Sequence, residues 1–330
     1  MFRLRWKSKE DSYAVRLISA AYPHLSREKL VESVAYGTFV SLEHKLLYTE
    51  TPKAACTTIK HFLRELSHAP PIRYEIGPLH ESRRDMFIHV RANVPLPSLV
   101  DLDNDTQEMV LTDPEYLRFC IVRNPYSRVI SAWRNKIIQC EPGYQLIYKR
   151  LAGEFPPLER KPIPSLNAFI HFLQSEQNLD NCNPHWQRQI THVLYSAISY
   201  THIGKLEALP ETLSHLQSHL GTSTQLNLTS KNRSVGDSHS NYLTKSAAEI
   251  IYQLYKDDFT TFNYSADSWH SYAVRNAVNS QAVSETKFLD EIIERNLVIS
   301  YLYEQCESNY RYSARRLRDV LNSLFSRNSY

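Results

Sequence analysis

The sequence T-P-K-A-A-C-T-T at residues 51–58 lies between a short apolar run, residues 45–49, and a helical pattern that continues to residue 66. This order predicts a buried strand, a tight loop and a helix. The first N–H groups of such a helix face the loop, and the helix dipole adds positive potential there. With the charge of Lys53 and two hydroxyl groups, the stretch can bind a phosphate. In the alternative interpretation, Thr57 or Thr58 only caps the helix.

The loop differs from the Walker A phosphate loop of ATPases. That motif, G-x-x-x-x-G-K-[ST], needs glycines so that the backbone can wrap around the phosphates. Here Lys53 precedes the small residues, and the chain holds only 7 glycines, none of them between Gly37 and Gly77. An ATPase or an ordinary kinase is therefore disfavoured.

A second unit of the same kind follows. The apolar run L-R-F-C-I-V at residues 117–122 predicts a strand, and Pro125 can begin the next helix. Arg123 would then end the strand and Ser131 would lie in the helix, where a charge and a hydroxyl can converge on one phosphate. A solvated helix start is the alternative. A third apolar run, residues 200–203, predicts a strand that ends at Gly204. It completes an alternation of strands and helices that is typical of a mainly parallel sheet.

Helical patterns mark other parts of the chain. They occupy the segment after Ser26, which is a good N-cap, and residues 243–257, 288–298 and 310–325. We expect one domain over residues 1–264 and a helical extension over residues 265–330. The extension would serve packing, homo-oligomerisation or acceptor selection.

Composition excludes several other classes of protein. The net charge of +3 is too small to favour nucleic-acid binding. The five cysteines are odd in number and widely spaced, which argues against a disulfide framework or a zinc site, and no cluster of metal ligands occurs. No apolar run is long enough to span a membrane, and no signal peptide opens the sequence. We therefore expect reduced thiols and a cytoplasmic protein.

Four ordered segments, within residues 45–264, resemble the carbohydrate sulfotransferases that use PAPS (3′-phosphoadenosine 5′-phosphosulfate), and most closely the chondroitin 4-O-sulfotransferases. They are P-K-A-A-C-T-T-I-K (52–60), V-R-N-P-Y-S-R-V-I-S-A-W-R-N-K (122–136), N-P-H-W (183–186) with Y-T-H-I-G-K-L-E (200–207), and Y-K-D-D-F (255–259) with F-N-Y (262–264). Asn263 stands where the family usually has glycine.

The resemblance implies an α/β, P-loop-like sulfotransferase fold, with a central parallel sheet flanked by helices and the donor loops at the carboxyl ends of the strands. It also implies the donor-binding residues. The residues that would hold the 5′-phosphosulfate are Lys53, Ala54, Ala55, Cys56, Thr57 and Thr58. Arg123 and Ser131 would hold the 3′-phosphate. Arg233 would close over the donor or lie in a solvated loop. Lys53 would also stabilise charge on the leaving oxygen.

Sulfonate transfer also needs a base for the proton of the acceptor hydroxyl, and histidine suits neutral pH. His89 is the favoured base, because some glycan sulfotransferases are similar in having a catalytic histidine in this part of the chain. His185 is the rival, or it orders the fold beside Trp186. Glu207 would orient one of these histidines, bind the acceptor or form a salt bridge. A last group would contact an anionic sugar or form a solvated basic face: Arg83, Arg84 and Arg91.

We therefore expect a PAPS-dependent sulfotransferase that acts on a hydroxyl-bearing glycan by in-line displacement, releases PAP (adenosine 3′,5′-bisphosphate) and requires no metal. The alternatives are a sulfotransferase for a lipid, a small metabolite or a protein tyrosine, an ATP-dependent phosphotransferase, and a non-catalytic PAP- or glycan-binding protein. The motifs leave the acceptor and the sulfated position open.

Overall fold

The computed structural model describes residues 9–70, 72, 88–139, 141, 143–153, 164–176, 178–221, 243–273 and 296. The chain forms two compact units, residues 1–129 with 174–274 and residues 130–173 with 275–330. The predicted C-terminal helices, except Asn296, lie outside the described residues. The predicted domain boundary at residue 264 stays a prediction.

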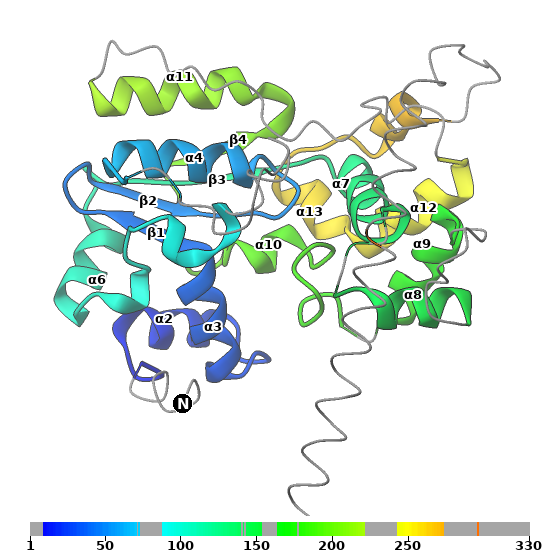
Figure 1. Cartoon of the computed structure of the whole chain (residues 1–330), viewed down its shortest axis with the longest axis horizontal. Helices are drawn as coiled ribbons and strands as arrows, with labels where there is room; N and C mark the ends of the chain where they lie inside the picture. The colour runs from blue at the N-terminus through cyan, green and yellow to red at the C-terminus, as the bar shows by residue number, and fades with distance from the viewer. Residues whose placement is uncertain are drawn as a thin grey trace, which may run out of the picture. The chain divides into compact units, whose positions relative to one another are not determined.

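A four-stranded sheet forms the centre of the first unit (Figure 1). Its strands follow chain order: β1 (Thr38–Ser41), β2 (Leu46–Thr49), β3 (Leu117–Val122) and β4 (His202–Lys205). The pairs β2/β3 and β3/β4 are parallel, whereas β1 and β2 are antiparallel. The α/β class and the mainly parallel sheet are therefore confirmed. The sequence did not predict β1, and the third predicted strand begins two residues later than expected.

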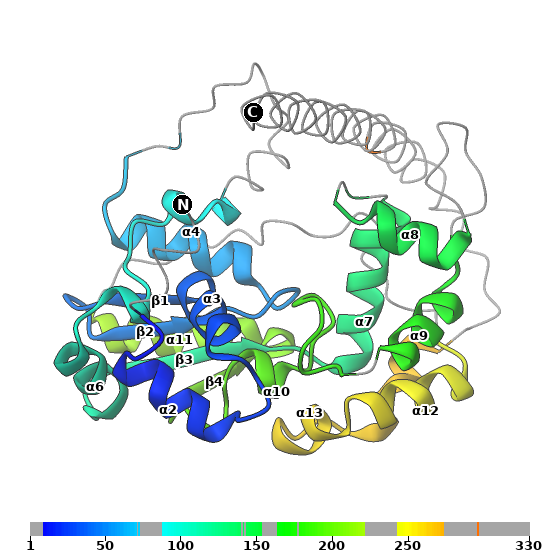
Figure 2. The same cartoon turned by 90° about the horizontal axis from the view of Figure 1, so that it is seen from below.

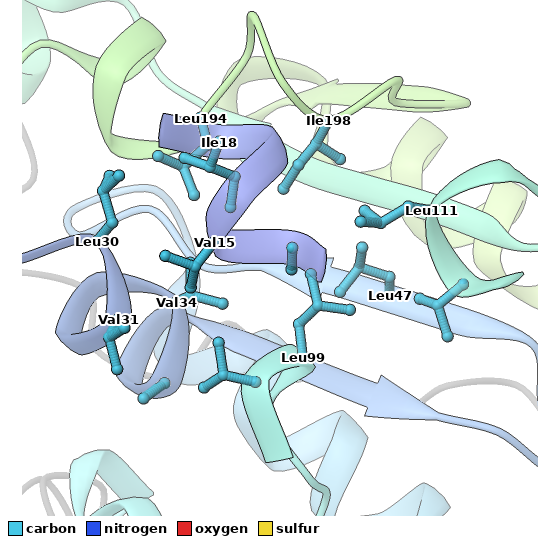
Figure 3. Close-up of a cluster of buried hydrophobic side chains, with 14 of the residues drawn as sticks. Val15, Ile18, Leu30, Val31, Val34, Leu47, Leu99, Leu111, Leu194 and Ile198 are labelled. Atoms are coloured by element: carbon cyan, nitrogen blue, oxygen red, sulfur yellow. The ribbon is translucent and has the colours of Figure 1, made fainter. Parts of the chain in front are cut away.

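Three helices cover one face of the sheet: α2 (Tyr13–Ala21), α3 (Arg27–Gly37) and α6 (Asn104–Thr112). Ser26 caps α3 as predicted, because its side chain accepts a hydrogen bond from the N–H of Lys29. The apolar residues of these helices pack with Val40 and Leu47 of the sheet into one core cluster (Figure 3). The view from below shows α2 and α3 in front of the strands (Figure 2).

The helices α4 (Cys56–Leu66) and α11 (Leu209–Leu220) cover the other face. A second core cluster joins them to the strands through Ile59, Leu63 and Leu216. Gly204 lets β4 approach α11 closely, because a Cβ atom at this position would lie 2.2 Å from Oγ1 of Thr212. Gly204 therefore lies inside the strand and does not end it, as the sequence had suggested.

The described part of the first unit contains further helical elements. They are α10 (Gln189–His192), α12 (Lys245–Leu254), α13 (Lys256–Thr261) and the 3₁₀ turns Arg91–Asn93, Leu99–Asp101, Leu206–Ala208 and Ala266–Tyr272. The helix predicted over residues 243–257 thus ends at Leu254, and α13 begins two residues later.

Helices make up the second unit as far as it is described. The helix α7 (Pro125–Trp133) begins in the first unit, continues as a π-helical turn (Arg134–Ile138), and is followed by α8 (Gln145–Ala152) and α9 (Leu166–Ser175). The indole N–H of Trp133 donates to the carbonyl of Pro164 at 3.0 Å. Among the described residues, no helix combines the length and the apolar character that crossing a membrane requires.

Candidate active site

The first loop, residues 51–55, joins β2 to α4 in an unusual backbone conformation. Lys53 and Ala55 have φ values of 71° and 58°, in the left-handed region that glycine normally occupies. Each such residue costs about 1–2 kcal/mol, and strain of this kind gathers at functional sites. The chain thus builds a tight strand-to-helix loop at this site without glycine.

The start of α4 faces this loop. Ala55 is the N-cap of the helix and forms no side-chain cap, so capping by Thr57 or Thr58 is ruled out. Both threonines lie in the first turn of α4 and are largely buried. The helix dipole, the two hydroxyl groups and Lys53 therefore occupy one segment, as an anion site requires.

The second loop, residues 123–124, lies beside the first. It follows β3, whose Cys120 is the register partner of Thr49 in β2, so the two strands end at the same edge of the sheet. The guanidinium of Arg123 donates to the carbonyl oxygen of Lys53 at 3.0 Å and to Oγ of Ser127 at 2.8 Å. The structure therefore brings together two of the residues predicted to bind the donor.

Arg128 connects the first loop to a third segment. The residue is only 1% exposed, and its guanidinium donates to the carbonyl oxygens of Pro52, Pro184 and Gln187 at 3.2, 2.9 and 2.7 Å. Burial lowers the pKa of this side chain from its usual value. The alternative of a solvated helix start is therefore wrong for Arg128, which the sequence gave no reason to single out because its partners are 56 to 76 residues away.

Gln189 fixes the backbone of the second loop. Its Nε2 donates to the carbonyl oxygen of Arg123 and its Oε1 accepts from the N–H of Arg123, both at 2.8 Å. Asp258 in turn accepts from the N–H groups of Gln189 and Ile190 at 2.8 and 2.9 Å. Because Gln189 and Asp258 are both fully buried, they form a rigid support behind Arg123. The sequence assigned no role to either residue, although Asp258 lies in the segment Y-K-D-D-F (255–259) that resembles the family.

Glu207 holds the second loop from another side. It accepts from the N–H of Asn124 and from the hydroxyl of Tyr264, both at 2.9 Å. Burial and this carboxylate raise the pKa of Tyr264 well above its usual range. Glu207 thus orients the loop of Arg123, a role that the sequence did not suggest.

His89 contacts the beginning of α4. Its Nε2 lies 3.0 Å from Oγ1 of Thr57, its Nδ1 lies 3.4 Å from Nζ of Lys60, and its carbonyl oxygen accepts from the hydroxyl of Tyr36 at 3.2 Å. Lys60 also forms a buried ion pair with Glu50, the residue after β2. The structure therefore places the favoured base against a predicted donor-binding threonine.

The rival base, His185, has a different environment. Its Nδ1 lies 2.9 Å from Oδ1 of Asn183 within the same turn. The neighbouring Trp186 is buried, and its carbonyl oxygen accepts from the hydroxyl of Tyr255 at 2.6 Å. These contacts agree with the alternative that this segment orders the fold.

Other predicted site residues divide into three groups. Arg91 donates to the carbonyl oxygens of Ala35, Thr38, Val94 and Leu96. Its guanidinium therefore connects separate backbone segments and does not belong to a solvated basic face. Arg83, Arg84 and Arg233 lie outside the described residues. Ser131 is buried in α7 and belongs to the second unit, so its pairing with Arg123 on one phosphate stays a prediction.

The last feature of the site concerns the described cysteines and the side chains that could bind a metal ion. Cys56, Cys120 and Cys182 are free thiols, and burial raises the pKa of Cys56 above its usual value. Within the described part of the chain, no three His, Cys, Asp or Glu side chains gather in a metal-binding arrangement.

Comparison with known proteins identifies a family. A family model described as "Sulfotransferase family" matches residues 36–265. Human carbohydrate sulfotransferase 9 is 25% identical over 245 residues, which cover 69% of this chain and 53% of that protein. Mouse carbohydrate sulfotransferase 11 is 26% identical over 70% of this chain and 67% of its own length, and Xenopus laevis carbohydrate sulfotransferase 12 is 27% identical over 67% and 58%. No solved structure gives a significant match.

Proposed function

Because the chain belongs to the sulfotransferase family, we propose that it transfers a sulfonate group from PAPS to a hydroxyl group of a carbohydrate. The observation that carries the proposal is the junction of the two loops, where Arg123 donates to the carbonyl oxygen of Lys53. Two cationic loops that share a hydrogen bond suit a donor with phosphate groups at both ends of its ribose. The names of the relatives support a carbohydrate acceptor. The chain spans little more than half of human carbohydrate sulfotransferase 9.

In this proposal the first loop binds the reacting end of the donor. The N–H groups at the start of α4 and the hydroxyls of Thr57 and Thr58 hold the 5′-phosphosulfate. Arg123 holds the 3′-phosphate, which ATP and AMP lack, and the contribution of Ser131 stays a prediction from the sequence. The described residues fit a dianionic ligand at this edge of the sheet, since the uncapped start of α4 provides N–H donors.

The transfer is an in-line displacement at sulfur. The acceptor oxygen forms a new S–O bond while the bond between sulfur and the 5′-phosphate oxygen breaks, and the electron pair of that bond remains on the leaving PAP. Lys53 stabilises the charge that develops on this leaving oxygen. The acceptor proton moves to a base, for which His89 is the better placed candidate because it contacts Thr57 of the first turn.

The direct test is sulfonate transfer. Purified protein is incubated with labelled PAPS and a panel of glycans, lipids, phenols and tyrosine peptides, and PAP and the sulfated product are quantified. We expect product with at least one glycan, a large loss of kcat in His89→Asn, and a small loss in His185→Asn. Product from a lipid or peptide alone would refute the acceptor class, and consumption of ATP in place of PAPS would refute the function. The cytoplasmic location and homo-oligomerisation stay predictions.

A further inference from the structure

A buried ion pair lies directly behind His89. Glu50 follows β2 and Lys60 is in the second turn of α4, and the two are only 3% and 2% exposed. The rings of Tyr36 and Phe39 lie 5.1 and 5.4 Å from the ammonium. A desolvated charged pair is rarely a gain in stability over apolar residues of similar size. This pair therefore invites an explanation beyond packing.

The ammonium group of Lys60 stays protonated in this environment. Burial lowers its pKa, but the negative charge of Glu50 and the hydrogen bond to that carboxylate outweigh the effect of burial, so the pKa ends above the usual value. An ammonium group has three donor hydrogens and no lone pair to accept with. In its contact with Nδ1 of His89, Lys60 must therefore donate and Nδ1 must accept.

The direction of this hydrogen bond determines which ring nitrogen of His89 carries the proton. A neutral imidazole carries one proton, and with a lone pair on Nδ1 that proton lies on Nε2. The contact between Nε2 and Oγ1 of Thr57, at 3.0 Å, is then a hydrogen bond from His89 to Thr57. Because the hydroxyl of Thr57 accepts from the ring, its own hydrogen must point to another acceptor.

We propose that the Glu50–Lys60 pair is a positioning device, which holds His89 as the Nε2–H tautomer so that the ring orients the hydroxyl of Thr57 in the first turn of α4. The benefit to donor binding rests on the proposed function, in which Thr57 donates to the 5′-phosphosulfate. A nitrogen that already carries a proton cannot accept another. The base role of His89 therefore requires that the contact with Lys60 opens when the acceptor binds.

Side-chain NMR tests the tautomer without any assay of activity. Long-range ¹H–¹⁵N spectra of the ¹⁵N-labelled full chain distinguish the two neutral tautomers, and His89→Asn assigns the signals. We expect His89 of the wild type to be the Nε2–H form at pH 7.5. In the double variant Lys60→Met/Glu50→Leu, which leaves no unpaired buried charge, a substantial Nδ1–H population should appear. Lys60→Arg should retain the Nε2–H form.

The control is an exposed ion pair between the same residue types, Lys45 with Glu115, whose side chains are 47% and 65% exposed. Lys45→Met/Glu115→Leu should leave the tautomer unchanged, and thermal unfolding of each variant verifies the fold. An Nδ1–H form in the wild type, or a double variant at Lys60 and Glu50 with an unchanged spectrum, would overturn the proposal.

Calorimetric binding of PAP tests the consequence for the donor site. Loss of one oriented hydrogen bond should weaken PAP binding by about 3- to 10-fold in Lys60→Met/Glu50→Leu, and not in the control pair. If the wild type bound no PAP, the proposed function would fail while the tautomer result stood. If PAP bound equally to wild type and variant, the positioning role for Thr57 would be refuted.

Discussion

Replacing Gln189 with alanine should weaken donor binding, although the proposed donor contacts do not include the side chain of Gln189. The side chain forms two hydrogen bonds of 2.8 Å with the backbone of Arg123 and is fully buried. A buried polar group that loses its partner costs about 1–3 kcal/mol. Two such groups give about 2–6 kcal/mol, and we expect the lower part of this range because Arg123 is only half-buried. For a chain of this length that loss corresponds to a fall in Tm of about 3–6 °C.

The effect on ligand binding follows from the freedom that Arg123 gains. A charge-assisted hydrogen bond contributes about 1.5–3 kcal/mol, so a displaced guanidinium should weaken PAP binding by at least about 10-fold. Binding of 5′-AMP, which has no 3′-phosphate, should change little. Calorimetric titration of both nucleotides into Gln189→Ala measures the two affinities.

Gln187→Ala is the matched control. Gln187 is also buried and forms two side-chain contacts, with the carbonyl of Asp180 at 2.7 Å and with Nδ1 of His192 at 3.1 Å, neither of them in the second loop. Both variants should lose stability, but only Gln189→Ala should lose the preference for PAP over AMP. An equal preference in Gln189→Ala and wild type would refute the reasoning.

Three further predictions concern the sheet, the leaving group and acid stability. Gly204→Ala should destabilise the fold by about 1–3 kcal/mol in urea unfolding, because its Cβ would overlap the buried Thr212, and Gly204→Ala/Thr212→Ala should recover part of that loss. Lys53→Ala should lower kcat for sulfonate transfer by about 10²- to 10³-fold while PAP affinity falls less, as steady-state kinetics and calorimetry would show. Burial and Arg128 lower the pKa of His192 to about 3. As the pH falls, the imidazole of His192 is therefore protonated in the unfolded chain before it is protonated in the folded chain. The free energy of unfolding should then fall below about pH 6.5 by at most about 1.4 kcal/mol per pH unit. His192→Gln should reduce this slope, as unfolding measured at about pH 7 and about pH 5.5 would show.

Each of these predictions has a contrary outcome. An unchanged unfolding free energy in Gly204→Ala would show that α11 shifts at no cost. A full kcat in Lys53→Ala would remove Lys53 from the transfer step. A pH dependence that is the same with and without His192 would assign acid sensitivity to other groups.

Local patterns predicted the elements that carry the site. The strands over residues 46–49 and 117–122 are short apolar runs, and the helices after them have clear apolar faces, so β2, α4, β3 and α7 could be expected from the sequence. The strand β1 has only four residues and directly follows α3, which leaves no periodicity to detect. The end of the third strand was misplaced because glycine often marks the end of a strand. In the structure, Gly204 lies inside the strand and allows close packing against Thr212.

The supports of the site were not predictable in the same way. Gln189, Asp258 and Arg128 contact partners that are 56 to 76 residues distant in the sequence. No local pattern therefore assigned them a supporting role, although Arg128 and Asp258 lie in segments that resemble the family. The left-handed conformations of Lys53 and Ala55 were hidden as well, since glycine is the residue that usually signals them. The favoured base could be identified, but its contacts with Lys60 and Thr57 needed the structure.

The central claim is that the two loops recognise a nucleotide with a 3′-phosphate, and calorimetric binding of PAP, 5′-AMP and ATP to the wild type and to Arg123→Ala tests it most directly. We predict that the wild type binds PAP at micromolar concentration or tighter and binds AMP and ATP much more weakly, and that Arg123→Ala loses about 1.5–3 kcal/mol for PAP and with it the preference. Equal binding of PAP, AMP and ATP to the wild type would contradict the account.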